Sequence, residues 1–248
     1  MMSRLKFMNT EIDNLTMDEA LHEIEKLIKA GNASYVVTPN VDHIVQLETN
    51  EDLQKVYANA SLILTDGKPL LWISKWYGTP IKEKISGSDL FPLLCKLAAQ
   101  KGYKMFFLGA EKGVAATAAK NLSKKYKGLN VIGTYSPPFG FEKDIDEIKK
   151  IVSMIKETKP HILVVGLGCP KQEMFMYNYC KELEVPVSFG LGASFDFEAG
   201  KVKRAPRWMA DHGLEWLFRI TQDPKRMAKR YIINDSKILK LIIKYRKK

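Results

Sequence analysis

The chain has 248 residues, of which 46% are hydrophobic and 27% are charged, a composition typical of an ordinary globular protein with one large α/β domain or two small ones. No stretch approaches the roughly 18 apolar residues of a membrane-spanning helix, and the first residues have no hydrophobic signal core. We therefore expect a protein that neither crosses a bilayer nor leaves the cell by the usual signal.

The net charge of +11 is concentrated at one end of the chain. Residues 201–248 hold 15 Lys and Arg against 4 Asp and Glu, whereas residues 1–200 hold 24 of each class. A neutral body with a cationic tail predicts an anionic partner, which phospholipid, nucleic acid and phosphorylated small molecules all satisfy.

Apolar strands and amphipathic helices alternate along the first 200 residues. Thr16 to Glu19 form a capping box that predicts a helix to about Ala30. Strands are predicted at 34–37, 62–64, 104–109, 130–135, 161–166 and 186–190, and helices at 51–59, 68–77, 88–101, 113–126, 142–158 and 171–184. This alternation predicts a Rossmann-like parallel sheet with helices on both faces over residues 1–200, followed by a basic helical appendage over residues 201–248.

Ligands of an open parallel sheet bind beyond the carboxyl ends of its strands, so the residues after each predicted strand are the candidates for a site. These residues are Thr38-Pro39-Asn40, Asp66-Gly67, Gly109-Ala110, Gly166-Leu167-Gly168 and Gly190-Leu191-Gly192. Their glycines allow the backbone to approach a ligand closely.

Asp66 directly follows the apolar run 62–64. Asp-Gly is a common turn pair and Asp caps helices well, so 66-DGKP-69 is consistent with a simple helix start. An acid at the end of a buried strand is also how a general base is presented. Its position alone leaves both interpretations open.

Two strand-to-helix junctions are further candidates. In 107-FLGAEKGVAATAAKNL-122 the start of a helix is suited to phosphate, but the segment lacks a full G-x-G-x-x-G and a Walker lysine, and an ordinary turn explains its glycine equally well. In 166-GLGCPKQE-173, Lys171 and Gln172 are expected to point toward the crevice, where Gln172 can bind a sugar or phosphate. The alternative is a solvated helix start with Glu173 favoured by the helix dipole.

We predict no metal site and no cofactor. Asp144 and Asp146 form a D-x-D, but acids in the first turn of an amphipathic helix are explained by the helix dipole. The four histidines are scattered singly, without metal-ligand spacing. Cys95, Cys169 and Cys180 are expected to be unpaired thiols in a reducing cytoplasm.

The tail mixes apolar residues with cations. An apolar stripe at helical spacing, surrounded by lysines, consists of Ile238, Leu241, Ile242 and Tyr245. This pattern is typical of an interfacial helix on an anionic membrane, although a helix packed on the protein's own core looks similar. Basic helices also bind nucleic acid, but the first 200 residues show no nucleic-acid-binding fold, so we predict a membrane and no nucleic acid.

Seven segments in this order resemble the WecG/TagA/CpsF family of bacterial glycosyltransferases. They are 38-TPNVDHI-44, 66-DGKPLLW-72, 86-SGSDL-90, 107-FLGA-110, 168-GCPKQE-173, 190-GLGASFDFEAG-200 and 204-RAPRWMADHGLEWLFRITQDPKRMAKRY-231. The resemblance implies metal-independent, inverting transfer of a sugar, with N-acetylmannosamine our first choice, from a UDP-sugar to undecaprenyl-pyrophosphate-linked N-acetylglucosamine. The product would serve teichoic acid, capsule or exopolysaccharide synthesis. N-acetylmannosaminuronate or a hexose is the alternative donor sugar.

The resemblance also implies a set of site residues. Asp66 would be the general base, and Thr38, Asn40 and Gln172 would surround the sugar. The C-terminal arginines Arg219, Arg226 and Arg230 would stabilise the diphosphate of the leaving UDP. Nucleotide contacts would come from Gly109, Ala110, Gly166, Gly168, Phe195 and Asp196.

Two departures from the family's pattern affect the sugar site. Many members have Arg where this chain has Lys84, and lysine keeps the charge but loses bidentate geometry. A second glycine often follows the Asp-Gly pair, where this chain reads 66-DGKP-69. Both departures bear on the identity of the donor more than on the reaction class.

The expected location is the inner face of the bacterial cytoplasmic membrane, with residues 201–248 as the peripheral contact and a possible homo-oligomer as the assembly. Two alternatives from other classes are a UDP-sugar-sensing membrane adaptor without turnover and a nucleic-acid binder that uses the tail. The adaptor predicts that Asp66→Asn leaves binding intact, and the nucleic-acid binder predicts salt-dependent retention on DNA or RNA.

Overall fold

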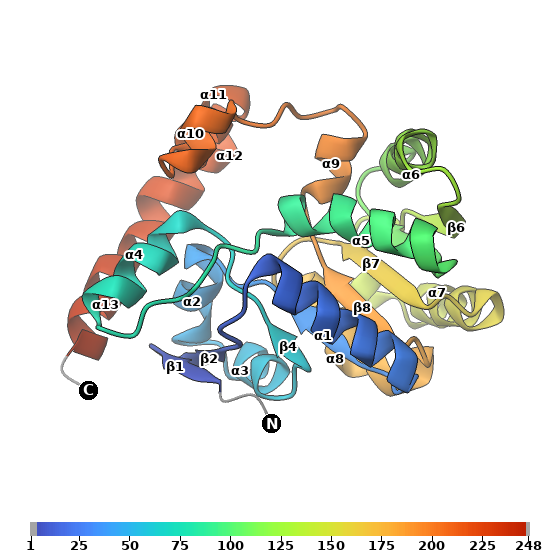
Figure 1. Ribbon diagram of the computed structural model, residues 1–248, viewed down its shortest axis with the longest axis horizontal. Coiled ribbons are helices and arrows are strands. Elements are labelled where there is room, and N and C mark those ends of the chain that lie inside the picture. Colours follow the sequence, from blue (N-terminus) through green and yellow to red (C-terminus); the bar gives the residue numbers. More distant parts are fainter. Residues whose placement is uncertain (1–3, 247–248) are drawn as a thin grey trace.

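The protein is built on a six-stranded parallel sheet with the strand order β4-β3-β8-β7-β5-β6 (Figure 1). The computed structural model describes residues 4–246 without the Arg226 side chain, so that side chain and the terminal Lys247 and Lys248 of the predicted tail lie outside the described residues. The strands are β3 (Tyr35–Val37), β4 (Leu62–Ile63), β5 (Lys104–Gly109), β6 (Asn130–Tyr135), β7 (Ile162–Gly166) and β8 (Val187–Gly190). The predicted α/β fold with a Rossmann-like parallel sheet is confirmed.

Helices cover both faces of the sheet, and each face has its own apolar core. Along β3, Tyr35 and Val37 point into one core and Val36 into the other, as the alternation of a strand requires. One face is covered by α1 (Met17–Ala30), α5 (Gly87–Lys101) and α6 (Val114–Lys125). The other is covered by α2 (Val41–Leu47), α3 (Glu51–Ala58), α7 (Ile145–Thr158) and α8 (Lys171–Leu183).

Capping residues explain where several helices begin. Thr16 and Glu19 form the predicted capping box of α1, in which the Thr16 N–H donates to the Glu19 carboxylate at 2.8 Å. Asn40 caps α2, a short helix that the sequence analysis missed because its residues continue a motif that reads as a loop after a strand. The side chain of Asn40 is therefore fixed by its own helix before any ligand is considered.

Other elements were also absent from the sequence-based prediction. An antiparallel pair, β1 (Leu5–Phe7) and β2 (Thr10–Ile12), precedes α1, and α9 (Ser194–Glu198) follows β8. The 3-10 helix η1 (Phe141–Lys143) precedes α7. Each is five residues long or shorter, too short for a hydrophobic period to show.

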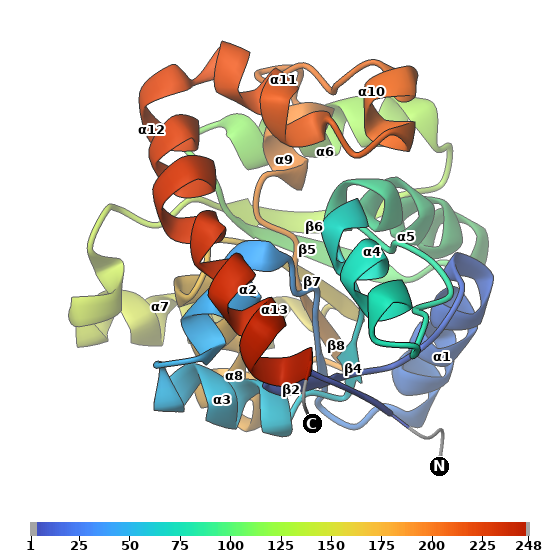
Figure 2. The same cartoon turned by 90° about the vertical axis from the view of Figure 1, so that its left-hand side faces the viewer.

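The basic appendage is helical, as predicted, and runs down one side of the molecule (Figure 2). Its elements are α10 (Arg207–Asp211), α11 (Glu215–Gln222), α12 (Pro224–Ala228), η2 (Lys229–Asn234), η3 (Asp235–Lys237) and α13 (Ile238–Arg246). None of the helices in the described part of the chain is both long and apolar enough to span a membrane.

The stripe predicted to lie on a membrane packs on the protein instead. Ile238 and Leu241 are buried in the core beside α2, and Ile242 and Tyr245 are partly buried against it. Tyr245 also hydrogen-bonds Glu48 at the end of α2 at 3.0 Å. The sequence could not distinguish a helix that lies on a membrane from one that packs on the protein, because both require an apolar stripe on a basic helix.

Candidate active site

The carboxyl edge of the sheet brings most of the predicted site residues together. The Asp66 N–H donates to the Pro39 carbonyl at 2.8 Å, which ties the loop after β4 to the loop after β3. The Thr38 hydroxyl reaches the Gly190 carbonyl at 3.4 Å, and the Ala110 N–H donates to the Gly166 carbonyl at 2.8 Å. The loops after β3, β4, β5, β7 and β8 thus form one continuous edge.

Asp66 lies at this edge with a half-buried side chain, directly before α4 (Lys68–Trp76). Gly67, not Asp66, is the capping residue of α4, and no side chain caps that helix, so the helix-start interpretation of Asp66 fails. Burial raises the pKa of the Asp66 carboxyl above its ordinary value, and the cations of Arg219 and Lys84 oppose this rise. A carboxylate with a raised pKa beside two cations is suited to accept a proton.

Lys84 reaches the same region from the loop before α5 and is paired with acids. Its ammonium donates to Asp89 at 2.9 Å and lies 3.8 Å from Glu215 of the appendage. Although burial alone would raise it, hydrogen bonds from Ser86, Arg204 and Lys84 lower the pKa of Asp89 to about 2. Arg204 also forms an ion pair with Asp89. This pair joins the appendage to α5, and the Lys84–Glu215 contact joins it to the loop before α5.

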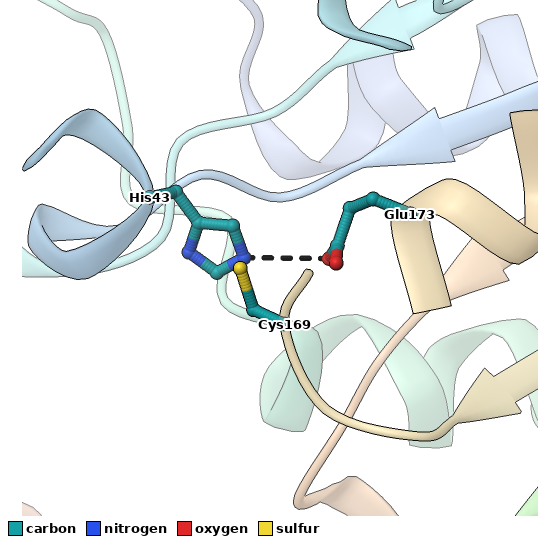
Figure 3. A group of neighbouring side chains, drawn as sticks. All are labelled: His43, Cys169 and Glu173. Atoms are coloured by element: carbon teal, nitrogen blue, oxygen red, sulfur yellow. Dashed lines mark hydrogen bonds and ion pairs between the residues drawn. The ribbon is translucent and has the colours of Figure 1, made fainter. Parts of the chain in front are cut away.

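A buried hydrogen-bonded network connects Asn40 with Gln172 through His43 and Glu173, and Figure 3 shows the contact between the last two. The His43 ring contacts the Asn40 amide oxygen through Nδ1 at 2.9 Å and the Glu173 carboxylate through Nε2 at 3.3 Å. The Gln172 amide donates to the same Glu173 oxygen at 2.7 Å and accepts from the Gly192 N–H at 3.2 Å. Glu173 is 1% exposed, so the alternative of a solvated helix start is wrong for this residue.

The same network is the one group among the described residues whose donor atoms are close enough to hold a metal ion. His43, Cys169 and Glu173 offer nitrogen, sulfur and oxygen atoms within 4.8 Å of one another (Figure 3). The sequence does not indicate this pairing of a histidine with a cysteine, because His43 and Cys169 are far apart along the chain. The imidazole nitrogen and one carboxylate oxygen already bind each other, and Gln172 uses that oxygen too, so hydrogen bonding accounts for the arrangement.

Electrostatics support an ionic contact between His43 and Glu173. Burial disfavours the charged imidazole, but Cys169 and Glu173 together hold the pKa of His43 well above its ordinary value. Nδ1 faces the Asn40 amide oxygen at 2.9 Å and the Asn40 N–H at 3.4 Å, while Nε2 faces the Glu173 carboxylate. The other oxygen of Glu173 has no hydrogen-bond partner within the described residues.

Two of the three predicted arginines have described side chains, and both lie near this edge. Arg230 donates to the Asn40 amide oxygen at 3.3 Å and lies 3.6 Å from Asp42. Arg219 stacks over the Phe197 ring, 5.3 Å from its centroid, and its charge acts on Asp66. The Arg226 side chain lies outside the described residues.

The predicted nucleotide residues gather around α9 and the glycine loops. Gly109, Ala110 and Gly166 lie at the ends of β5 and β7, while Gly168 is exposed. A Cβ on Gly166 would lie 2.5 Å from the Phe195 ring, which is buried among core aromatics, so Phe195 has no ring face open to a base. Asp196 is partly buried on α9. A shallow cavity of about 350 Å³ lies beside this loop, lined by Lys112, Gly113, Val114, Thr117, Ala199, Gly200 and Lys201.

Three other expectations are resolved. Lys171 forms an ion pair with Glu142 at 2.5 Å, so its ammonium group already has a partner within the protein. Asp144 caps α7 by accepting from the Asp146 and Glu147 N–H groups at 3.0 and 3.1 Å, which confirms the helix-start explanation of the D-x-D. The three cysteines are free.

Comparison with known proteins identifies the family. The chain matches the model described as "Glycosyl transferase WecG/TagA/CpsF family" over residues 5–248. The chain belongs to this family.

Named relatives extend the similarity over most of their own length. A Bacillus spizizenii protein named N-acetylglucosaminyldiphosphoundecaprenol N-acetyl-beta-D-mannosaminyltransferase is 32% identical over 224 residues, which cover 90% of this chain and 83% of that protein. Proteins of the same name are 34% identical over 71% of this chain and 67% of the relative in Bacillus subtilis, and 28% identical over 92% and 88% in Staphylococcus aureus. This WecG/TagA/CpsF family member is therefore a glycosyltransferase.

The sequence analysis did not name three residues that the structure places at this candidate site, namely His43, Glu173 and Glu215. A signal for all three was present, since His43, Glu173 and Glu215 lie within the quoted segments 38–44, 168–173 and 204–231. The contact between His43 and Glu173 depends on how β3 and β7 are spaced in the sheet, which no local pattern encodes.

Proposed function

We propose that this glycosyltransferase moves N-acetylmannosamine from a UDP-sugar to polyprenyl-diphosphate-linked N-acetylglucosamine, with inversion and without a metal, in teichoic acid or related cell-surface polymer synthesis. The observation that carries the proposal is Asp66, a half-buried carboxyl with a raised pKa, at the sheet edge where Arg219 and Lys84 act on it. The names of the relatives support this acceptor and this sugar.

In the proposed reaction Asp66 takes the proton of an acceptor hydroxyl. That oxygen forms a bond to the anomeric carbon while the bond from this carbon to the UDP oxygen breaks, and UDP leaves with the electron pair. One displacement inverts the carbon and requires a single base. Thr38, Asn40, Lys84 and Gln172 would hold the sugar, and Gly109, Ala110, Gly166 and Gly168 the nucleotide, with Phe195 acting through its backbone and Asp196 beside it.

The division of labour between residues 1–200 and residues 201–248 is part of the proposal. The first part would carry the donor site, and the appendage would close over the diphosphate through Arg219, Arg226 and Arg230. Positive groups there would stabilise the negative charge that collects on the leaving UDP. The appendage would also hold the enzyme on the inner face of the cytoplasmic membrane, where the lipid-linked acceptor lies. N-acetylmannosaminuronate or a hexose is the alternative sugar, and a non-catalytic adaptor is the alternative class.

Released UDP tests the proposal. Full-length protein is incubated with detergent-solubilised polyprenyl-diphosphate-N-acetylglucosamine, a panel of UDP-sugars and EDTA. We expect release with UDP-N-acetylmannosamine, undiminished by EDTA and reduced by at least about 10³-fold in Asp66→Asn, because the acceptor hydroxyl then has no base. Asp144→Asn, which alters an exposed helix cap, is the matched control and should retain activity.

Each other outcome has a distinct meaning. Release with another sugar alone would correct the donor. UDP-sugar binding without release from any sugar would favour the adaptor, and full activity of Asp66→Asn would exclude Asp66 as the base.

A further inference from the structure

The exposed apolar residues of the protein are unevenly distributed. Of the large apolar side chains that are exposed in the described part of the chain, those outside α4 and the appendage are Phe139 and Ile145. The remainder are Trp72, Trp76, Trp208, Trp216, Leu217, Ile232, Ile233, Leu239 and Ile243. Exposed apolar residues in such a concentration mark a surface that binds something.

Helix α4 contributes two tryptophans to this surface, although the sequence analysis placed it wholly within the catalytic body. Trp72 and Trp76 are 52% and 53% exposed, and four residues separate them, so they lie on one stripe of the helix. Their neighbours Lys68 and Lys75 are cationic, and α4 contains no acid.

Direct contacts join α4 to the appendage. The Tyr77 hydroxyl after α4 donates to the Ile242 carbonyl at 2.9 Å, and the Arg246 guanidinium lies over the Trp76 ring, 4.6 Å from its centroid. Gly213, between α10 and α11, packs so closely that a Cβ there would lie 2.6 Å from Trp72. The two elements lie side by side on one flank of the molecule (Figures 1 and 2).

The exposed stripe of α13 continues the face that α4 begins. Leu239 and Ile243 are 63% and 67% exposed and lie one turn apart. Ile243 is adjacent in helical position to Arg246, which contacts Trp76. This stripe differs from the one that packs on α2, so α13 binds its own protein on one side and leaves another apolar side free.

Charge decides which partner fits this face. The tail carries all of the net positive charge of the chain, and α13 contains Lys240, Lys244 and Arg246 without an acid. Tryptophan and lysine around aliphatic side chains match the headgroup region of a bilayer, where the ring lies at the boundary and the ammonium group meets phosphate. A second copy of this chain is a poorer fit, because its positively charged face would repel the same face of the first copy.

We propose that Trp72 and Trp76 of α4, together with the Leu239 and Ile243 stripe of α13, form one composite surface that binds an anionic phospholipid bilayer. This surface deepens the proposed membrane contact of residues 201–248 and rests on it. Only Gly67 separates Asp66 from α4, so the helix that follows the proposed base is the helix that lies on the bilayer. The base would thereby be held at the height of a lipid-linked acceptor.

Vesicle flotation tests the composite surface without donor or acceptor. Full-length protein is mixed with vesicles that contain phosphatidylglycerol or only phosphatidylcholine, and the floating fraction is measured. We expect wild type to float with the anionic vesicles. Trp72→Ser/Trp76→Ser should lower the partition coefficient by about tenfold or more, because a tenfold loss corresponds to only about 1.4 kcal/mol of membrane-binding free energy, shared between two tryptophans. Phe139→Ser/Ile145→Ser removes the two exposed large apolar residues that lie outside α4 and the appendage, and it should float like wild type.

A charge variant and a size measurement complete the test. Lys75→Glu/Lys240→Glu should weaken flotation with the anionic vesicles, and unchanged circular dichroism of all variants would show that they fold. Wild-type flotation with equal flotation of Trp72→Ser/Trp76→Ser would overturn the role of α4 while leaving the appendage contact in place. Absence of wild-type flotation would overturn both. Light scattering that shows an oligomer dissociated by Trp72→Ser/Trp76→Ser, with flotation unchanged, would assign the face to a second copy and overturn the proposal.

Discussion

The side chains proposed to hold the sugar are themselves held by a buried carboxylate. Asn40 caps α2 and Gln172 lies in the first turn of α8, yet both connect to Glu173, Gln172 directly and Asn40 through His43. Arg230 of the appendage donates to the same Asn40 oxygen. Gln172 therefore depends on Glu173 directly, whereas Asn40 is held by the N–H groups of α2 and touches Glu173 only through His43.

Glu173→Gln tests this dependence. The substitution keeps the side-chain volume but removes the negative charge that the His43 ring and the Gln172 amide share, so both hydrogen bonds to residue 173 weaken. We expect kcat/KM for UDP release to fall roughly tenfold to a hundredfold, as misplaced binding groups do. Glu142→Gln, which removes a surface ion pair at the start of the same helix, should retain wild-type kinetics. Equal kinetics of the two variants would contradict the positioning role.

The turns at the ends of β5 and β7 show how closely two elements approach at the site. Gly109 has φ +115°, and a Cβ there would lie 2.4 Å from the Gly166 carbonyl oxygen. This combination of a left-handed backbone and a tight contact requires glycine. The glycine that the sequence presented as ordinary turn chemistry is thus also required by packing between neighbouring strands.

Two glycine substitutions separate backbone strain from close approach. Gly140 also has a positive φ, +86°, but nothing lies within 4 Å of a Cβ there. Gly140→Ala should lower the free energy of unfolding by about 1–2 kcal/mol through backbone strain alone. Gly109→Ala should lower it by about 3 kcal/mol or more, because the clash adds to the strain. Urea denaturation measures both values, and equal losses would show that the contact between the strands yields.

The contact between the appendage and the α/β domain includes a buried acid. Asp235 is buried beside α2, and its Oδ1 has no hydrogen-bond partner in the described part of the chain. Burial raises the pKa of Asp235 to about 6 from an ordinary value of 3.8, with Asp42 adding to the rise and Arg230 and His43 opposing it. The folded state therefore binds a proton that the unfolded state releases between these two pH values.

This proton makes the folded state less stable as pH rises. Because the folded state holds more protons, the contribution of Asp235 falls as pH rises from about 4 to about 6, by at most about 3 kcal/mol. Asp235→Asn should therefore be more stable than wild type at pH 8, and the difference should shrink toward pH 5. Thermal unfolding at both pH values measures it, with the exposed Asp211→Asn as the control. A difference that does not vary with pH would contradict the assignment.

Local patterns in the sequence sufficed for the elements that have a clear period or a cap. The helix after Thr16, the apolar strands and the order of the parallel α/β units all follow from hydrophobic spacing and turn chemistry. The short helix α2 escaped because Asn40 reads equally as a loop residue and as a cap, and β1 and β2 are three residues long.

The same distinction between local pattern and tertiary packing applies to the residues of the candidate site. Asp66, the glycine turns and the cationic tail could be read from the chain because each is a property of adjacent residues. The contact of His43 with Glu173, the orientation of Lys171 and the side of α13 that faces the protein could not be read from it. These depend on which strands are neighbours and on where an amphipathic helix docks, and both are settled by packing among residues far apart in the sequence.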